Sequence, residues 1–383
     1  MKLRALVLAT AALAVTATTA SAHGRPFQPP PPPAPAPAPA PAGTVFVQTD
    51  SGAGNQVVVY DRSQTGTLTQ AGAYATGGLG GQLTGSVVDH LASQDSLVYD
   101  QQAGDLLAVN AGSNTVSVFA VHGDRLFLTQ VVASGGDFPA SIAVRGNLVY
   151  VLNALGGGSL QGYFLAFDHL VPVPGSSRQL GLSLTATPQF TNTPGEVAFS
   201  PDGSQLLVTT KANGSAIDAF RVGPFGELSA SPVVNSEPGA VPFSLTFDPQ
   251  GQALVALAGT DALASFALAP TGTLTTLDTL ATGATATCWI AAADGYYYLS
   301  NAGSATLSTF TASPSGQLTL VGSTPTDAGT VDATASGDGR FLYVQAGGPG
   351  IVDEFAIGSR GALQSIGSVL VPGAAGGEGI AAS

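Results

Sequence analysis

An aromatic side chain recurs along this chain at a nearly constant interval. It lies near the end of a short apolar segment each time, at Tyr60, Phe119, Phe167, Phe220, Phe266, Phe310 and Phe355. The last three intervals are 46, 44 and 45 residues, and the earlier ones are 59, 48 and 53. A period in the forties is typical of β-propeller blades, each of which is a sheet of four strands. The sequence therefore predicts an all-β fold, a seven-bladed β-propeller of four-stranded antiparallel blades.

Residues 195–232 show one complete repeat, in which three apolar segments and a more polar fourth are separated by turns. The first turn is Ser-Pro-Asp-Gly at 200–203, where proline presets φ and glycine accepts a positive φ. Related turns follow at 248–251, 292–295 and 336–339. A Gly-x-Leu turn before the fourth segment recurs at Gly66, Gly226, Gly272, Gly316 and Gly361.

The two ends of the repeat region complement each other. Residues 44–49 match the second strand of a blade, whereas residues 377–383 resemble 195–200, which is an innermost strand. We therefore expect the C-terminal strand to complete blade one and close the ring, because closure hides the edge strands of an open array. A β-sandwich pair, the competing fold, needs neither a constant period nor complementary ends.

The N-terminal region predicts export. Residues 1–22 combine Lys2 and Arg4 with an apolar stretch and an Ala-Ser-Ala sequence, as in a secretory signal peptide cleaved after Ala22. We expect a secreted, extracellular protein that uses general secretion, although an uncleaved segment would anchor the chain. Residues 23–43 form a Pro/Ala-rich linker, which is either a spacer or a solubilising tail. Residues 44–383 form the propeller domain.

Composition excludes several classes of function. The chain has 24 acidic and 11 basic residues and a net charge of −13, and Lys211 is the one lysine after Lys2. No basic surface for nucleic acid can be built from these residues.

The single cysteine, Cys288, cannot form an internal disulfide, and we expect it to be a small buried side chain. No phosphate loop, dinucleotide fingerprint, serine elbow or metal-ligand cluster occurs, so we expect neither a cofactor nor a metal. We expect a monomer without a membrane span after signal cleavage.

The junction of blades three and four departs from the repeat. Residues 155–159 are glycine-rich, and residues 169–194 are longer than the repeat requires. Long loops are where a propeller usually carries its function. We therefore place the candidate site at this junction.

The blade pattern resembles that of a known family. The Pro-Asp-Gly turn, the second strand at 341–344, the third strand at 115–119 and the Gly-x-Leu turn are similar to those of the seven-bladed lactonase family. That family includes bacterial 6-phosphogluconolactonases and fungal carboxymuconate-lactonizing enzymes, and the resemblance spans residues 44–383. It implies metal-independent action on small acidic lactones by histidines, an arginine and a glutamate at the channel mouth.

Most of those family groups are replaced in this chain. The histidine-rich segment before the fourth inner strand corresponds to 192–195, which has no histidine, and the Pro-Arg-His before the fifth corresponds to 242–244. The family glutamate falls on Gly259. Lactone hydrolysis needs a base to activate water and a cation to hold the developing negative charge. The remaining candidate catalytic residues are His169, Arg178, Glu196 and Lys211.

Each candidate also has a structural interpretation. His169 is either a base or a polar turn residue, and Arg178 is either an anion clamp or a loop anchor. Glu196, with its counterpart Glu378, either faces the channel or accepts hydrogen bonds from backbone amides. Lys211 either acts at the channel mouth or lies in a solvated turn.

Two functions of different class follow. The first is a secreted lactonase-like hydrolase or cycloisomerase, which acts on a small lactone or sugar-acid lactone at the channel mouth. The alternative is a non-catalytic extracellular propeller that binds a small ligand, a polymer or a protein. The resemblance favours the first, and the replaced family residues favour the second.

Overall fold

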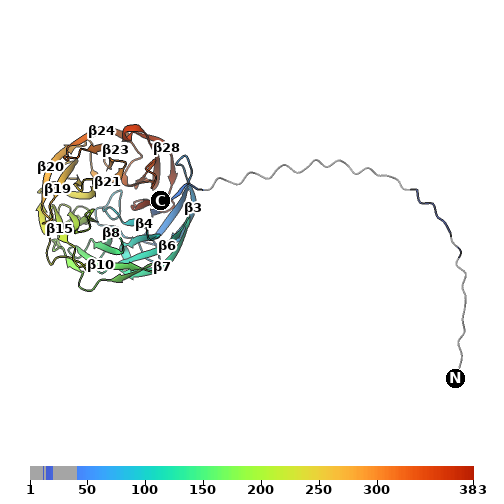
Figure 1. The fold of residues 1–383 in the computed structure, drawn as a ribbon, viewed down its shortest axis with the longest axis horizontal. Helices are drawn as coiled ribbons and strands as arrows, with labels where there is room; N and C mark the ends of the chain where they lie inside the picture. The colour runs from blue at the N-terminus through green and yellow to red at the C-terminus, as the bar shows by residue number, and fades with distance from the viewer. Residues whose placement is uncertain (1–11, 13, 20–40) are drawn as a thin grey trace, which may run out of the picture. The chain divides into compact units, whose positions relative to one another are not determined.

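The computed structural model describes residues 12, 14–19 and 41–383. The predicted signal peptide and linker lie largely outside the described residues, and their boundaries stay predictions. In the described part, seven antiparallel sheets stand around a central axis (Figure 1). The predicted seven-bladed β-propeller is confirmed.

Each blade is a sheet of four strands, to which blade three adds the short β12. From the innermost strand outward, the strands are β29 (Ile380–Ala382), β1 (Gly43–Gln48), β2 (Gln56–Arg62) and β3 (Leu68–Ala75) in blade one; β4 (Leu97–Asp100), β5 (Asp105–Asn110), β6 (Thr115–His122) and β7 (Arg125–Ala133) in blade two; β8 (Pro139–Arg145), β9 (Leu148–Asn153), β10 (Ser159–Ala166) and β11 (His169–Pro172), with β12 (Arg178–Gln179), in blade three; and β13 (Pro194–Phe199), β14 (Gln205–Thr210), β15 (Ala216–Arg221) and β16 (Val233–Ser236) in blade four.

The remaining three blades follow the same plan. Their strands are β17 (Pro242–Phe247), β18 (Ala253–Leu257), β19 (Ala262–Leu268) and β20 (Leu274–Ala281) in blade five; β21 (Thr287–Ala293), β22 (Tyr296–Asn301), β23 (Thr306–Ala312) and β24 (Leu318–Pro325) in blade six; and β25 (Thr330–Ala335), β26 (Phe341–Ala346), β27 (Ile351–Ile357) and β28 (Leu363–Leu370) in blade seven. The short helices are η1 (Ala111–Ser113), α1 (Gln189–Asn192) and η2 (Ser359–Gly361).

The recurring aromatic residues pack between blades, with one correction. Six of the seven predicted positions are buried, but Phe167 is 94% exposed in the turn after β10. Its place is held by Tyr163, which is 1% exposed and pairs with Val149 as Phe220 pairs with Leu206 in blade four. The assignment failed because β10 already contains two adjacent aromatic residues, Tyr163 and Phe164, and Phe167 follows just after the strand ends.

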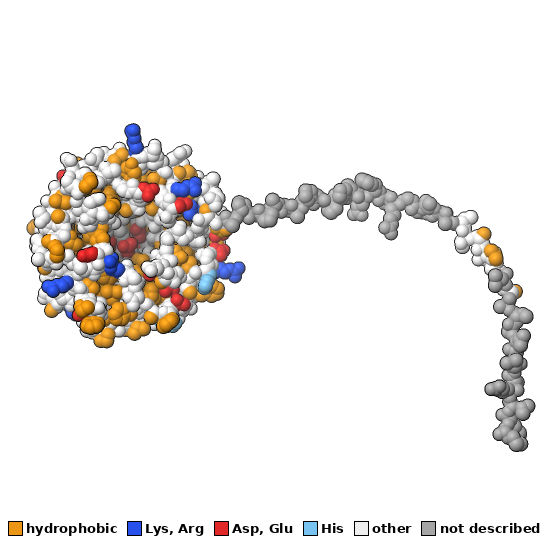
Figure 2. Space-filling model, viewed as in Figure 1, with side chains coloured by type: hydrophobic (Ala, Val, Ile, Leu, Met, Phe, Trp, Pro, Cys, Tyr) orange, Lys and Arg blue, Asp and Glu red, His pale blue; other side chains and the backbone are white. Residues whose placement is uncertain are grey.

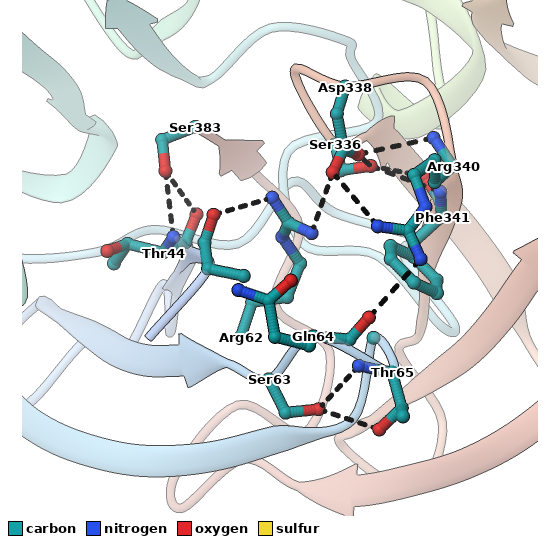
Figure 3. Close-up of polar contacts among 12 residues, drawn as sticks. Thr44, Arg62, Ser63, Gln64, Thr65, Ser336, Asp338, Arg340, Phe341 and Ser383 are labelled. Carbon is teal, nitrogen blue, oxygen red and sulfur yellow. Dashed lines mark hydrogen bonds and ion pairs between the residues drawn. The ribbon is translucent and has the colours of Figure 1, made fainter. Parts of the chain in front are cut away.

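The C-terminal strand closes the ring as predicted. β29 pairs antiparallel with β1, and the Ser383 amide donates to the Thr44 carbonyl at 2.9 Å. Beside it, buried Arg62 donates to Asp338 at 3.1 Å and to the Ala42 carbonyl at 2.9 Å (Figure 3). Blades one and seven are therefore joined by side-chain contacts as well as by the chain, which passes from β28 of blade seven to β29 in the sheet of blade one.

The antiparallel strands place their connections on two faces of the ring. We call the face at the end of each second strand, where β14 ends at Thr210, the upper face. The lower face is the one at the start of each second strand, where the turn at 200–203 connects β13 to β14. The innermost strands run between these faces and line the central channel.

Candidate functional site

Residues 76–96, which connect β3 to β4, enter the centre of the ring. We call this segment the plug; it is the blue-to-cyan chain inside the ring in Figure 1. The Ser93 carbonyl accepts a hydrogen bond from Trp289 Nε1 of blade six at 2.6 Å. The Gln94 amide donates to the Gly195 carbonyl of blade four at 3.2 Å. The plug therefore bridges innermost strands on different sides of the channel.

Lys211 lies under the plug. It follows β14, is 1% exposed, and its Nζ donates to the Ala92 carbonyl at 2.5 Å. The same Nζ stands 5.2 Å from the ring centroid of Phe243 and 5.9 Å from that of Phe190. Lys211 is thus a channel residue, and its interpretation as a solvated turn residue is wrong.

Three carboxyl groups accompany Lys211, and we call the four residues the upper cluster. Glu378 Oε1 accepts hydrogen bonds from the amide and hydroxyl of Ser93, and the Glu378 amide donates to Asp50 Oδ2 at 2.8 Å. Asp89 is fully buried, and within residues 41–383 no donor reaches either of its oxygens or Glu378 Oε2.

Burial controls the protonation of the upper cluster. It raises the pKa of Asp50 and of Asp89 to about 7 each, and the attraction of Lys211 for the Asp89 carboxylate opposes this rise. It also raises the pKa of Glu378 well above its ordinary value, with Asp89 adding to the effect. Burial lowers the pKa of Lys211 to about 8 against the attraction of Asp89 and Glu378. The cluster can therefore exchange protons near neutral pH.

A second set of acids lies in the channel, formed by Asp95, Glu196 and Asp332, which we call the lower cluster. Glu196 is 1% exposed, and its Oε2 accepts from the Leu245 amide at 2.6 Å. Its predicted interaction with a backbone amide is confirmed. Burial raises the pKa of Glu196 and of Asp332 well above their ordinary values, and the charge of Asp95 adds to both shifts.

Cavities differ in size between the two faces. Near the upper face, beside α1 and Asn213, lies a cavity of about 50 Å³. On the lower side, cavities of about 270, 330 and 240 Å³ lie between blades three and four, blades four and five, and blades two and three. Figure 2 shows acidic side chains inside a central hollow. Of these four cavities, the three on the lower side are the larger.

The four predicted catalytic residues do not gather around one cavity. His169 is exposed at the start of β11, where its Nδ1 contacts the Phe167 carbonyl at 2.8 Å. Arg178 donates from Nε to the Ser229 carbonyl at 2.8 Å, and it also contacts the Leu228 carbonyl. These contacts tie the outer part of blade three to blade four, as expected of a loop anchor. Only Glu196 and Lys211 line the channel, and their catalytic roles stay predictions.

Other expected features of the site can be compared with the described residues. Cys288 is buried in β21, as predicted, and burial raises the pKa of its thiol. Among residues 12, 14–19 and 41–383, no three His, Cys, Asp or Glu side chains are placed to hold a metal ion. No helix in this same part of the chain is long and apolar enough to cross a membrane.

Sequence reasoning missed the plug and two acidic residues within it, Asp89 and Asp95. Residues 76–96 carry no helical or strand periodicity, so they resemble an ordinary connection. One signal was available, however. The interval of 59 residues between Tyr60 and Phe119 is the longest of the series. The plug accounts for the residues beyond the usual length of a repeat.

Comparison with known proteins agrees with the fold. A candidate 6-phosphogluconolactonase from Bacteroides fragilis superposes with a TM-score of 0.69 at 19% identity, over 89% of this chain and 98% of that one. The periplasmic gluconolactonase PpgL of Pseudomonas aeruginosa gives 0.68 at 21% identity, over 86% and 96%. Virginiamycin B lyase of Staphylococcus aureus is more distant, with 0.53 at 12% identity over 75% and 87%.

These likenesses confirm the predicted resemblance to lactonase propellers at the level of the fold. No protein-family model matches the chain, and no curated protein sequence matches it either. Since one propeller scaffold carries many activities, the function has to be argued from the site.

Proposed function

We propose that this chain is an exported, ligand-binding propeller that uses the scaffold of the lactonases without their channel-mouth chemistry. The observation that carries this proposal is the burial of Lys211 beneath the plug. Lactone hydrolysis needs a base in contact with water and a cation in contact with the substrate. Lys211, Asp89 and Glu378 are each at most 1% exposed, so neither a lactone nor bulk water reaches them while the plug is in place.

The hydrogen bonds of Lys211 support the same conclusion. Its ammonium group binds a backbone carbonyl of the plug and faces the rings of Phe190 and Phe243. An oxyanion would have to replace the Ala92 carbonyl at that position. We interpret Lys211 as the cation that holds the plug, and the larger cavities of the lower face as the ligand-binding side.

A second candidate is a lactonase-like hydrolase that acts after the plug is displaced. It is favoured by the upper cluster, because groups with pKa values near 7 and 8 can give and take protons at physiological pH. In that case Asp89 or Glu378 would be the base, and Lys211 would hold the developing oxyanion. The substrate would be a small lactone or a sugar-acid lactone.

Hydrolysis of a panel of phosphorylated and unphosphorylated sugar lactones distinguishes the two candidates. The purified protein is compared with Lys211→Met and, as a control outside the channel, Arg178→Met, each with and without EDTA. The binding propeller predicts rates equal to spontaneous hydrolysis in all samples. Saturable hydrolysis that is lost in Lys211→Met and kept in Arg178→Met would overturn the proposal in favour of the hydrolase.

A further inference from the structure

The plug is bound to several blades, but some of its own polar side chains are unpaired. In addition to the contacts described above, Gln94 Oε1 accepts a hydrogen bond from the Ile290 amide at 2.8 Å. In contrast, both carboxyl oxygens of Asp89, Nδ1 of His90 and Oγ of Ser96 are buried without a hydrogen-bond partner in residues 41–383. Buried polar atoms without partners cost free energy that contact with water would recover. Displacement of the plug would therefore hydrate groups that are unpaired in the closed channel.

The backbone of the plug is strained at two positions. Ala92 and Asp95 have φ values of +53° and +61°, which a residue with a Cβ adopts only at a cost in free energy. Ala92 is also the residue whose carbonyl accepts the hydrogen bond from Lys211. A strained backbone persists only while the surrounding structure holds it in place. The closed conformation therefore depends on the groups that hold the plug from outside, which include Lys211 and Glu378.

The charge beneath the plug is unbalanced. Asp50, Asp89 and Glu378 are each at most 1% exposed, and Lys211 is the one cation of the upper cluster. When the three carboxyl groups hold protons, the cluster carries a single positive charge. When they ionise, three negative charges surround one positive charge in a site without bulk water, which is costly. The remaining titratable groups around the cluster are His90 and Asp95 of the plug, Cys288 of β21, Asp332 of β25 and Asp261 before β19.

We propose that the plug is a pH-dependent gate, which closes the upper mouth of the channel in acid and opens it as the carboxyl groups of the upper cluster ionise around a single lysine. Opening would bring water to Asp89, Glu378 and Lys211, and it would relieve the strain at Ala92 and Asp95. The gate needs no particular ligand, so it does not depend on the binding function proposed above.

The direction of the pH dependence follows from where the protons are held. Burial raises the pKa of Asp50 and of Asp89 from 3.8 to about 7, and it shifts the pKa of Glu378 in the same direction. The preference for the closed plug is therefore complete below the ordinary pKa values and is lost as the pH rises through about 7. His90, whose pKa is lowered by burial, acts in the opposite direction below its ordinary value, but it is one group against three. We expect the opening equilibrium constant to increase at least roughly tenfold from pH 5 to pH 7.5, while Lys211 stays protonated.

The reactivity of Cys288 measures the opening. This residue is the single cysteine of the chain, is buried, and belongs to the same apolar core as Leu91 and Ala92 of the plug. The full chain is treated with methyl methanethiosulfonate at pH 5 and at pH 7.5, and the modified fraction is followed by mass spectrometry. Val87→Cys in a Cys288→Ser background provides an exposed reference thiol, since Val87 is 83% exposed. The ratio of the two rates corrects for the larger thiolate fraction at higher pH, and we expect this ratio to increase at least roughly tenfold.

Low concentrations of urea separate opening of the plug from global unfolding. Labelling through a local opening changes little with urea, whereas labelling through global unfolding accelerates steeply, because much more surface is exposed. We expect the Cys288 rate at pH 7.5 to be nearly independent of urea well below the unfolding transition.

Two variants test whether the upper cluster controls the gate. Asp89→Asn removes one titrating group from a side chain that has no donor in residues 41–383, and it should reduce the increase with pH at least roughly threefold. Glu378→Gln keeps an acceptor for the Ser93 amide and provides the same test if Asp89→Asn fails to fold. Asp168→Asn, at an exposed position on a blade turn, makes the same change of net charge and should leave the increase unaltered.

Three results would each overturn the proposed gate. The first is a rate ratio that does not change between pH 5 and pH 7.5. The second is an increase that is equally large in Asp89→Asn and Glu378→Gln, and the third is labelling that accelerates with urea as global unfolding does. None of these measurements involves ligand binding or lactone hydrolysis, so failure of the gate and failure of the proposed function are distinguishable.

Discussion

Lys211 Nζ donates a hydrogen bond to the carbonyl oxygen of Ala92, 119 residues earlier in the chain, at 2.5 Å. This contact joins the end of β14 to the plug at the centre of the ring. A buried ammonium group is stable only when its charge is compensated, and here Asp89 and Glu378 provide that compensation. The stability of the closed channel is therefore tied to one lysine.

Replacing Lys211 should destabilise the protein. Lys211→Met keeps most of the side-chain volume but leaves Asp89 and Glu378 without their cation and the Ala92 carbonyl without its donor. We expect the free energy of unfolding to decrease by about 2 kcal/mol, because the buried Ala92 carbonyl loses a hydrogen bond from a charged donor. Urea denaturation measures this loss. Arg221→Met, at the exposed end of β15, is the control and should change stability by less than about 0.5 kcal/mol. Equal effects of the two substitutions would contradict the assigned role of Lys211.

Two arginines lie next to Asp338 where the ring closes, and they should contribute unequally to the free energy of unfolding. Arg62 is 3% exposed and lies 3.1 Å from Asp338, whereas Arg340 is 57% exposed and 4.0 Å away. We expect Arg62→Met to lower the unfolding free energy by about 3 kcal/mol and Arg340→Met by less than about 1 kcal/mol. Thermal unfolding of both variants tests the difference. A comparable decrease in both would show that burial of Arg62 does not matter to closure.

A pair of glycines separates steric conflict from backbone strain. Gly376 and Gly373 have nearly the same φ, +80° and +79°. A Cβ added at Gly376 would lie 2.1 Å from His90 Nε2, whereas a Cβ added at Gly373 would have no atom within 4 Å. We expect Gly373→Ala to cost about 1 kcal/mol for its backbone conformation. Gly376→Ala should cost about 2 kcal/mol more, because His90 of the plug has to move. Denaturant titrations of both variants provide the comparison, and equal costs would mean that the plug yields freely at His90.

The channel acids predict an unusual pH dependence of stability. Burial raises the pKa of Asp50 from 3.8 to about 7, so the folded protein holds this proton more tightly than the unfolded chain. The resulting stabilisation is complete below the unfolded pKa and is lost as the pH rises through the folded value, at up to ~1.4 kcal/mol per unit of difference. Lys211, with its pKa lowered to about 8, stays protonated across this window.

We therefore expect the free energy of unfolding to be lower at pH 7.5 than at pH 5. Urea titrations followed by the fluorescence of Trp289, the single tryptophan, measure this difference. A double variant, Glu196→Gln with Asp332→Asn, removes two of the titrating groups and should reduce the pH dependence. Stability that increases steadily from pH 5 to pH 7.5 would show that the channel acids are ionised in the folded protein.

The architecture could be predicted from the sequence because it is repeated. Turn glycines, apolar strands and the complementary ends each occur in a pattern that several blades share, so a single error, such as Phe167 in place of Tyr163, does not alter the blade count. The matching of residues 377–383 to an innermost strand was enough to predict the closure of blade one.

The site could be predicted only in part, since its residues are brought together by a segment outside the repeat. Lys211 and Glu196 were found because they interrupt the composition of regular strands. Asp89 and Asp95 belong to the plug, and their partners are fixed by long-range contacts that leave no local pattern. His169 and Arg178 were selected for their chemistry and for their place at the junction of blades three and four, but their strands lie in the outer part of blade three.

Amide hydrogen exchange in the plug tests most directly whether the upper channel is closed. The amides of Ser93 and Gln94 donate to Glu378 and Gly195, whereas Val87 of the same segment is 83% exposed and serves as the internal reference. The account predicts that Ser93 and Gln94 exchange as slowly as the amides of β14, and that Val87 exchanges rapidly. Exchange of Ser93 and Gln94 at the rate of Val87 would show an open channel mouth and contradict the account.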